Sequence, residues 1–262
     1  WVVGVLFLIG GAYLLSVYMS FTSTLKDIHS PIERKVSDMR VDEVALEKKQ
    51  PFSVLMLGVD EREGDAGRSD TIIVMTVNPN DKSTKMVSIP RDTYTEIIGK
   101  GSMDKINHAY AFGGIEMSMK TVENLLDIPI DYVVQVNMEG FEDIVDAVGG
   151  VQVNNTLDFS VDQFNYPKGN ITLNGEEALS YVRMRYEDPN GDFGRQDRQK
   201  QVIQAVMSEG ASVKSLVNYR SIFNALGDNV QTNMTFDEMM DVQKNYRNVV
   251  GTVDQLYFEK GT

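Results

Sequence analysis

Residues 51–92 read PFSVLMLGVDEREGDAGRSDTIIVMTVNPNDKSTKMVSIPRD and contain three segments typical of β-strands. Phe52–Val59 is a nearly continuous apolar run, Thr71–Val77 is rich in β-branched residues, and Lys85–Ile89 is a shorter segment of the same kind. The residues Asn78-Pro-Asn-Asp81 form a turn signal between the second and third segments. These features predict three successive strands that open a folded domain.

Strand and helix signals alternate along the rest of the chain. Further strands are expected at Tyr132–Val136, Val151–Asn154 and Leu256–Phe258. Helices are expected at Ile115–Leu126, at Phe141–Val148, after the cap Asn174-Gly-Glu-Glu177 and after the capping box Thr235-Phe-Asp-Glu238. This alternation predicts an α/β or closely mixed α+β domain.

The composition limits the kinds of partner and site. The chain has 262 residues and a formal net charge of -13, which argues against a nucleic-acid-binding surface because such surfaces are basic. It has no cysteine, so disulfides, thiolate metal sites and cysteine nucleophiles are excluded. The two histidines, His29 and His108, lie far apart in sequence, which argues against a histidine-rich zinc site.

The N-terminal segment is apolar and free of charge. No charged residue occurs from Trp1 to Leu25, and about 20 helical residues span the hydrocarbon core of a membrane. We expect residues 1–22 to form an uncleaved transmembrane signal anchor, residues 23–50 a charged juxtamembrane stalk, and residues 51–262 an extracytoplasmic domain. A cleavable signal peptide is the alternative, but the apolar run is longer than usual for one and no clear cleavage site follows it.

Charged residues flank the first three predicted strands. Asp60 follows the first strand, Asp70 precedes the second, and Arg91 and Asp92 follow the third. If the first two strands form an antiparallel hairpin, these residues and Arg68 meet at one edge of the sheet. Two carboxylates at one point repel unless a cation separates them, and Mg²⁺ prefers such oxygen ligands together with water and phosphate. The alternative is that both aspartates are turn and cap residues.

Four arginines lie close together in this acidic chain, namely Arg183, Arg185, Arg195 and Arg198. The guanidinium group binds phosphate and carboxylate oxygens bidentately, so the cluster predicts an anionic ligand. Arg183 and Arg185 share a face only where the backbone is extended. On a helix that begins near residue 194, Arg195, Arg198 and Gln199 would align. The alternative is a salt-bridged surface, because acidic residues are interspersed among the arginines.

Several familiar catalytic motifs are absent from the sequence. It contains no G-x-x-x-x-G-K-[ST] phosphate-binding loop and no G-x-S-x-G nucleophile elbow. A glycosidase with two catalytic carboxylates is compatible with the composition, but it does not account for the arginines.

Eight short motifs occur in a fixed order from about Pro51 to the C-terminus. They are Leu57-Gly-Val-Asp60, Gly67-Arg-Ser-Asp-Thr71, Ser88-Ile-Pro-Arg-Asp-Thr93, Lys105-Ile-Asn-His-Ala-Tyr110, Val148-Gly-Gly150, Ala178-Leu179, Arg183-Met-Arg185 and Gly194-Arg-Gln-Asp-Arg-Gln199. Each is weak alone, but together they resemble the LytR-CpsA-Psr family of cell-wall enzymes, and within it the Bacillus-type teichoic acid transferases. An N-terminal anchor before an extracytoplasmic catalytic domain is also the layout of that family.

The resemblance implies an α/β/α sandwich with a central mixed β-sheet and an apolar pocket that takes a polyprenyl chain. It also implies that pyrophosphate lies at the pocket mouth with Mg²⁺, or with Mn²⁺ as the other candidate ion. Asp60 and Asp70 match the family's metal positions. The residues expected to bind pyrophosphate are Arg68, Arg91, Arg183, Arg185, Arg195, Arg198 and Gln199.

The same resemblance indicates catalytic and lipid-binding residues. Arg91, Arg183 and Arg185 are expected to act in catalysis, and Asp92 is a candidate base for the acceptor hydroxyl. A candidate wall of the lipid pocket, for which ordinary core packing is the alternative, consists of Phe141, Ile144, Val145 and Val148.

By this resemblance, the expected function is transfer of an anionic glycopolymer, first of all wall teichoic acid, from a polyprenyl-pyrophosphate carrier to a peptidoglycan sugar hydroxyl. The expected location is the outer face of the cell membrane of a Gram-positive-type bacterium. The alternatives are a lipid-pyrophosphate hydrolase and a non-catalytic polyprenyl-phosphate binding protein. A transcriptional regulator, a label also given to such proteins, is the weakest hypothesis for so acidic a chain. Family domains usually continue past a segment like Leu256-Tyr-Phe258, so a final strand is expected beyond it.

Overall fold

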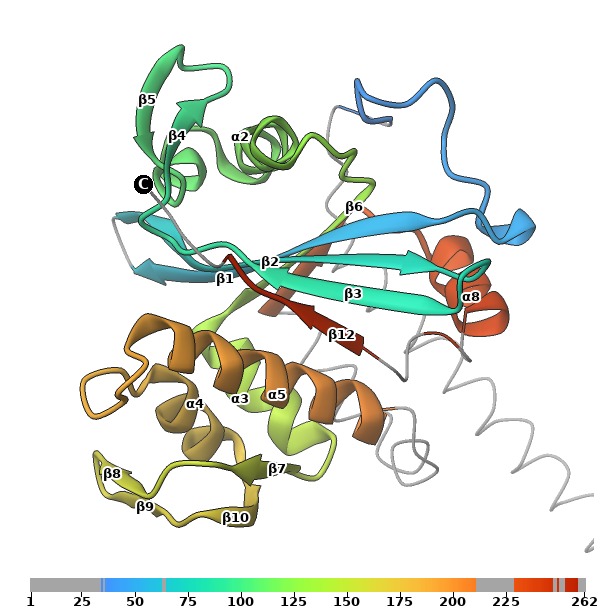
Figure 1. The fold of residues 1–262 in the computed structure, drawn as a ribbon. Helices are drawn as coiled ribbons and strands as arrows, with labels where there is room; N and C mark the ends of the chain where they lie inside the picture. The colour runs from blue at the N-terminus through green and yellow to red at the C-terminus, as the bar shows by residue number, and fades with distance from the viewer. Residues whose placement is uncertain are drawn as a thin grey trace, which may run out of the picture.

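A six-stranded mixed sheet forms the centre of the described structure, which comprises Arg34 and residues 36–62, 65–210, 229–246, 249 and 253–258 of the computed structural model. Its strand order is β11–β6–β1–β2–β3–β12 (Figure 1). The strands are β1 (Phe52–Arg62), β2 (Asp65–Asn78), β3 (Ser83–Ser88), β6 (Tyr132–Asn137), β11 (Val230–Thr232) and β12 (Val253–Leu256). β1 is antiparallel to β2 and parallel to β6, and β3 is antiparallel to β2 and parallel to β12. The predicted central mixed sheet is therefore confirmed.

The first two strands run further than the apolar pattern indicates. Their ladder continues to the pair Arg62 and Asp65, so Asp60 lies within β1 and Asp70 within β2 rather than at strand ends. Backbone pairing does not depend on apolar side chains, which is why the polar tip of the hairpin carries no strand signal in the sequence. The third strand likewise begins two residues earlier than predicted and spans Ser83–Ser88.

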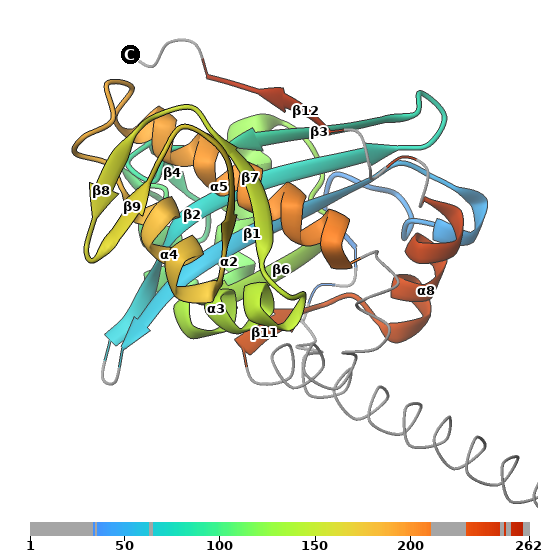
Figure 2. The same cartoon turned by 90° about the horizontal axis from the view of Figure 1, so that it is seen from below.

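Helices cover both faces of the sheet (Figures 1 and 2). Over one face lie α2 (His108–Leu126) and a hairpin of β4 (Tyr94–Ile97) and β5 (Ser102–Lys105); over the other lie α3 (Met138–Ala147), α4 (Gly175–Arg183) and α5 (Asp192–Gly210). Leu55 and Val74 of the sheet are buried in one core with Met119 and Val122 of α2. These layers are those of an α/β/α sandwich.

Side-chain caps explain where two helices begin. Asn174 caps α4 and Thr235 caps α8 (Phe236–Asn245), each in a capping box with the glutamate three residues later. Both starts agree with the sequence prediction. α2 begins earlier than predicted, because its first turn precedes a bend at Gly113 and Gly114, where the backbone leaves helical geometry.

Two small antiparallel pairs of strands cover the outside of α4. They are β7 (Val151–Asn155) with β10 (Gly169–Leu173), and β8 (Phe159–Val161) with β9 (Phe164–Tyr166). The rings of Phe159 and Tyr166 stack at 4.8 Å, and those of Phe159 and Tyr181 at 5.7 Å. This aromatic cluster holds α4 in place behind the site described below.

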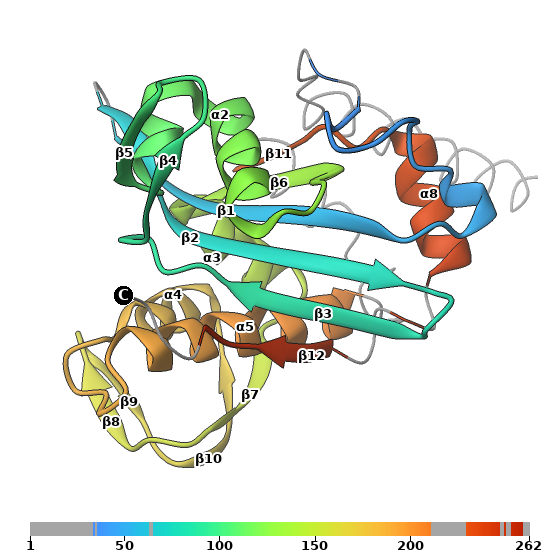
Figure 3. The ribbon, with the colours of Figure 1, turned by 45° about the horizontal axis from the view of Figure 1, so that its top comes forward.

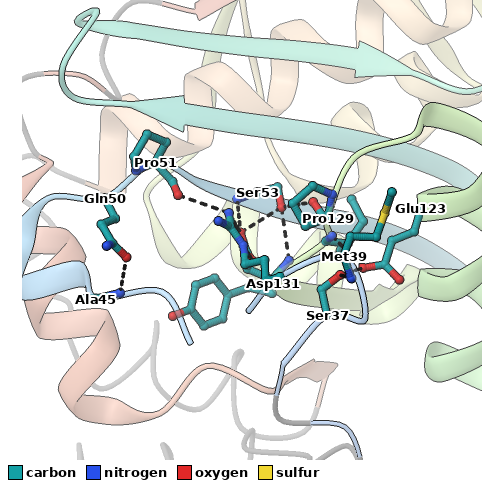
Figure 4. Close-up of polar contacts among 12 residues, drawn as sticks. Ser37, Met39, Ala45, Gln50, Pro51, Ser53, Glu123, Pro129 and Asp131 are labelled. Carbon is teal, nitrogen blue, oxygen red and sulfur yellow. Dashed lines mark hydrogen bonds and ion pairs between the residues drawn. The ribbon is translucent and has the colours of Figure 1, made fainter. Parts of the chain in front are cut away.

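The segment before β1 lies against the folded domain. Arg34 pairs with Glu123 at 2.5 Å, and the Ser37 hydroxyl donates to the same carboxylate. Arg40 pairs with Asp131. Asp131 lies beside Ser53 at the start of β1 (Figure 4). The two carboxylate side chains are only 6% and 5% exposed. The described part of the predicted stalk is therefore attached to the domain by two ion pairs whose carboxylates are buried.

The same segment also packs at the end of the sheet that lies away from the β1–β2 hairpin tip. The short helix η1 (Leu46–Lys48) lies beside α8 at that end (Figure 3), and Asn245 donates to the Leu46 carbonyl. The predicted transmembrane anchor, residues 1–22, lies outside the described residues. Within the described ranges, no helix combines the length and the apolarity needed to cross a bilayer.

Replacing Glu123 is expected to destabilise the fold strongly. Its carboxylate accepts hydrogen bonds from Arg34, Ser37 and the Ile130 backbone, so its removal leaves the Arg34 cation buried without a counter-charge. Loss of one member of a buried ion pair costs about 3–5 kcal/mol. Glu123→Ala should therefore lower the free energy of unfolding by about that amount, measured by equilibrium urea unfolding of the whole chain.

Glu116→Ala is the matched control on the same helix. Glu116 pairs with Lys120, and both side chains are 34% exposed. A loss below about 1 kcal/mol is expected there. Equal losses in the two variants would contradict the buried role of Glu123.

Candidate active site

Eight polar or charged residues line a cleft of about 380 Å³ at the hairpin end of β1 and β2. They come from that hairpin, from the link after β3, from β5 and from the start of α2. They are Asp60, Arg68, Asp70, Arg91, Asp92, Lys105, Asn107 and His108. The structure thus brings together the five residues that the sequence places at this edge of the sheet.

A β-bulge positions Asp70. The ladder pairs Gly58 with Thr71 and Val59 with Ser69, which leaves Asp70 as the extra residue of β2. A bulge of this kind interrupts the regular alternation and turns a side chain to a new direction.

A second cavity, of about 730 Å³, lies between the sheet and the helices α3, α4, α5 and α8. Its wall is mostly apolar and includes Val54, Met56, Val134, Leu179, Ile203, Val206 and Val242. Asp60 and Asp70 line this cavity as well as the polar cleft, so the carboxylates lie where the two meet. Protein interiors are close-packed, and an apolar cavity of this size therefore indicates room for an apolar ligand.

Three of the four residues predicted for the lipid-pocket wall line this apolar cavity. They are Phe141, Ile144 and Val145, all on α3. Val148 follows the helix and is 4% exposed in the core between α3, α4 and the outer strands. Val148 is therefore placed in that core and not in the lining of the cavity.

Helix α5 contributes two polar side chains to the apolar cavity. Arg195 and Gln199, one helical turn apart, both line it. Gln199 Nε2 donates to Thr71 Oγ1 at 3.0 Å, which ties α5 to the strand that carries Asp70.

Arg195 lies among other cations in a buried position. Its side chain is 11% exposed and pairs with Asp192 at 2.7 Å, while its Nε has no hydrogen-bond partner. Burial lowers the pKa of Arg195; Asp192 opposes this, and the charges of Arg91 and Arg185 lower the pKa further. An anion placed among these three guanidinium groups would satisfy the unpaired donor and reduce their repulsion.

Two ion pairs order the carboxylates beside Arg91. Arg91 binds Asp70 at 2.9 Å, and Lys105 Nζ binds Asp92 at 2.5 Å. The hydrogen bond from Lys105 lowers the pKa of Asp92 against the opposing effect of burial, and the charges of Arg91 and Arg185 add to the lowering. Asp92 is therefore an ionised, engaged carboxylate and a weak candidate for a base.

The two arginines at the C-terminal end of α4, Arg183 and Arg185, lie on either side of an extended residue. Arg183 ends the helix, and Met184 has φ -55° and ψ 133°. Arg183 lines the apolar cavity and contacts the Met138 sulfur. Arg185 lines neither cavity, but its charge acts on both Asp92 and Arg195.

Arg198 has a different role from the other arginines. It is 5% exposed and lines neither cavity. Its Nε donates to the Tyr181 carbonyl at 3.1 Å, and its two terminal nitrogens bind the Met184 carbonyl and Asp188. This guanidinium holds the α4–α5 connection and does not face the place predicted for the pyrophosphate.

Three residues of the cleft were not singled out by sequence reasoning. Lys105, Asn107 and His108 all belong to the motif Lys105–Tyr110, but neither local charge nor spacing distinguishes them there. The turn between β5 and α2 brings them to the cleft, and that turn carries no strong sequence signal.

Asp60 and Asp70 are the candidate metal ligands. Among the residues that the structure describes, no group of three or more His, Asp or Glu side chains could hold an ion by itself. Mg²⁺ typically takes one or two carboxylates and completes its shell with water and phosphate oxygens. The pair therefore fits an ion shared with a phosphate ligand better than an ion enclosed by protein.

Known proteins share the sequence of this chain over most of its length. The LytR_cpsA_psr family model matches residues 15–260. The polyisoprenyl-teichoic acid–peptidoglycan teichoic acid transferase TagU of Bacillus cereus is 56% identical over 255 residues, which make up 97% of this chain and 84% of that protein.

Solved structures share the fold as well. The crystal structure of Bacillus subtilis TagU is 56% identical, covers 79% of this chain and 84% of its own, and has a TM-score of 0.64. A structure of TagT bound to LI-WTA is 34% identical, covers 87% of this chain and 86% of its own, and has a TM-score of 0.70.

Removal of Arg195 is expected to weaken anion binding while leaving the fold stable. Arg195→Met keeps an apolar stem and removes a buried cation beside two others. Hydrogen bonds to a charged group contribute about 1.5–3 kcal/mol, so the affinity for inorganic pyrophosphate should fall by about tenfold or more. Isothermal titration calorimetry measures the affinity, and urea unfolding should show a change below about 1 kcal/mol.

Arg198→Met on the same helix is the matched control. It leaves Asp188 buried without its cation and should lower the free energy of unfolding by about 3–5 kcal/mol. The folded fraction should keep the affinity of the unmodified chain for pyrophosphate. If Arg195→Met instead lost stability and Arg198→Met lost affinity for pyrophosphate, the assignment of Arg195 to the ligand and Arg198 to the scaffold would be refuted.

Proposed function

Because this chain belongs to the LytR-CpsA-Psr family, we propose that it is a transferase that moves an anionic glycopolymer, wall teichoic acid, from a polyprenyl-pyrophosphate carrier to a peptidoglycan sugar hydroxyl. The observation that carries the proposal is the meeting of an apolar cavity with an arginine-and-carboxylate cleft at Asp60 and Asp70. A lipid pyrophosphate has the same two parts joined in the same way. The name of the Bacillus cereus relative supports the choice of polymer and acceptor.

The apolar cavity would bind the hydrocarbon chain of the donor. Burial of each CH₂ group contributes about 0.8 kcal/mol, so several isoprene units placed there would dominate the affinity. The pyrophosphate would then lie between Arg91 on one side and Arg183 and Arg195 on the other, with Arg185 adding charge from nearby.

The reaction requires little covalent chemistry from the protein. The acceptor hydroxyl oxygen forms a bond to the phosphorus that carries the polymer, and the bond from that phosphorus to the bridging oxygen breaks. The electron pair of that bond leaves with the polyprenyl phosphate. Phosphoryl transfer depends mainly on positioning and on stabilisation of charge, which the guanidinium groups of Arg91, Arg183 and Arg185 would supply.

We also propose that Mg²⁺, or Mn²⁺ in its place, binds at Asp60 and Asp70. The support is a pair of carboxylates at the junction of the two cavities, a donor set that suits an ion shared with phosphate. When bound, the ion would neutralise part of the charge on the phosphate oxygens.

A membrane location fits the proposed substrate. We propose that residues 1–22 anchor the chain in the cell membrane and that residues 51–262 act at its outer face. The support is the charge-free run from Trp1 to Leu25 and the need to reach a lipid carrier that resides in the bilayer.

Loss of Asp70 or Arg185 is expected to slow transfer strongly. The assay follows labelled lipid-linked glycopolymer passing to peptidoglycan oligomers, with the whole chain in detergent and Mg²⁺ present. Removal of one preorganised group that stabilises transition-state charge typically costs about 10²–10³ in rate. Asp70→Asn and Arg185→Ala should each show a loss of that size.

Asp81→Asn is the matched carboxylate control, because Asp81 lies in the turn after the far end of β2. It should transfer at the unmodified rate. Full rates for both Asp70→Asn and Arg185→Ala would place the site elsewhere. Free polymer as the sole product would instead indicate a hydrolase, and tight donor binding without any product would indicate a binding protein.

Filling the apolar cavity is expected to separate lipid binding from pyrophosphate binding. Ile203 on α5 lines the cavity, and Ile203→Trp places a larger ring in the volume proposed for the lipid. The affinity for a polyprenyl pyrophosphate should fall about tenfold or more, while the affinity for inorganic pyrophosphate should stay unchanged. Calorimetry with each ligand measures both.

Ile203→Leu conserves the volume and should alter neither affinity. If Ile203→Trp bound both ligands as the unmodified chain does, the hydrocarbon would have to lie outside this cavity.

A further inference from the structure

A histidine held by a carboxylate lies in the polar cleft without a role in the mechanism above. His108 Nδ1 lies 2.9 Å from Asp104 Oδ1. The ring is 29% exposed and lines the cleft together with Asp60, Asp70 and Arg91. The imidazole is therefore within the compartment proposed for the reacting phosphates and is also accessible to a ligand from solvent.

The contact with Asp104 determines which ring nitrogen is free. A carboxylate only accepts hydrogen bonds, so the nitrogen that faces it carries the proton. The Lys105 backbone N–H, which donates to Asp104 at 2.8 Å, and the contact with His108 together lower the pKa of Asp104 and keep it ionised. A neutral imidazole has a single N–H, so Nε2 of His108 keeps its lone pair and can accept a proton.

Packing fixes the ring as well as its tautomer. The Phe112 ring contacts the imidazole edge to face, with centroids 6.0 Å apart. Lys100 Nζ lies 3.0 Å from the Phe112 ring centroid and 3.9 Å from Asp104 Oδ2. Asp104 and His108 are four residues apart on the turn from β5 into α2, so the pair forms from local geometry.

The neighbouring carboxylates are already paired with cations. Asp70 pairs with Arg91, and Asp92 pairs with Lys105, which lowers its pKa. A base whose pKa lies far below the working pH accepts protons poorly, whereas an imidazole ordinarily titrates near pH 6.5.

We propose that His108 is the general base that activates the acceptor hydroxyl and that Asp104 is its positioning residue, which rests on the proposed transferase function. The hydroxyl proton passes to Nε2 as the acceptor oxygen forms its bond to the phosphorus that carries the polymer. The bond to the bridging oxygen breaks, and its electron pair leaves with the polyprenyl phosphate. The imidazolium then releases the proton to water.

The charges around the imidazole determine what a pH profile reports. They are Asp104 and Lys105 on β5, Lys100 before it, Arg91 and Asp92 after β3, and Asp60, Arg68 and Asp70 on β1 and β2. Carboxylates, lysines and arginines ordinarily titrate outside pH 5–8. A limb of the profile within that range therefore identifies the histidine.

The test is kcat/KM for the acceptor from pH 5 to pH 9, measured with the whole chain, Mg²⁺ and labelled lipid-linked glycopolymer. The unmodified chain should gain rate with rising pH and then level off. His108→Asn keeps a donor toward Asp104 but no base; it should lose that limb and about 10²–10⁴ in rate at pH 8. Its affinity for inorganic pyrophosphate should stay unchanged, which shows that it is folded.

Three further variants complete the experiment. Asp104→Asn should keep the limb and lose about tenfold or more in kcat with little change in KM, because the base is present but less well oriented. His108→Ala should recover part of its rate in added imidazole, which a structural role would not allow. His29→Asn, at the only other histidine of the chain, should behave as the unmodified protein.

Two outcomes would overturn the proposal in different ways. If the unmodified chain transfers polymer and His108→Asn keeps both the limb and a rate within about threefold, His108 is not the base and the transferase function stands. If the unmodified chain transfers nothing at any pH while still binding the donor, the transferase function falls and this proposal falls with it.

Discussion

The antiparallel pairing of β1 with β2 is the constraint on which the site depends. These two strands occupy the middle of the sheet, and their two faces differ in use. Leu55 lies opposite Val74 on the face that packs under α2, whereas Val54 lies opposite Met75 on the face that lines the apolar cavity. Because side chains alternate with a period of two, a shift of one residue would exchange a closed core with an open cavity.

The same pairing sets the electrostatics of the site. The bulge in β2 places Asp70 at the junction of cleft and cavity, where it pairs with Arg91. Arg195 is held nearby by Asp192 while it experiences the repulsion of Arg91 and Arg185. The ion pairs of Arg91 with Asp70 and of Arg195 with Asp192 offset part of the repulsion among these partly buried cations. The positive potential of Arg91, Arg185 and Arg195 favours a multiply charged anion between them.

The sequence was sufficient for β1, β2, β3, β6 and β7, for the two capping boxes and for the convergence of the residues around Asp60 and Asp70, because each follows from local pattern and chain reversal. The short strands β4, β5 and β8 to β11 were not predicted. The length of the β1–β2 hairpin was missed, since backbone pairing continues through polar residues. Among the arginines, spacing alone could not separate ligand from scaffold. Each residue of a helix is turned by about 100° around the helix axis from the one before it, so Arg195 and Gln199 are about 40° apart and share a face. Arg198 is about 60° from Arg195 in the opposite direction. Only the packing of α4 against α5 shows that this other side is buried.

The two halves of the proposed reaction depend on different kinds of contact. The donor site needs β2, α4 and α5 together, and the bond from Gln199 to Thr71 joins parts of the chain that are 128 residues apart. On the acceptor side, the proposed base His108 and its positioning residue Asp104 are four residues apart, across the turn from β5 into α2. Local contacts form without distant packing and can change without disturbing it. On this proposal, the acceptor would be met at the turn from β5 into α2, whereas the lipid pyrophosphate would be held by β2, α4 and α5.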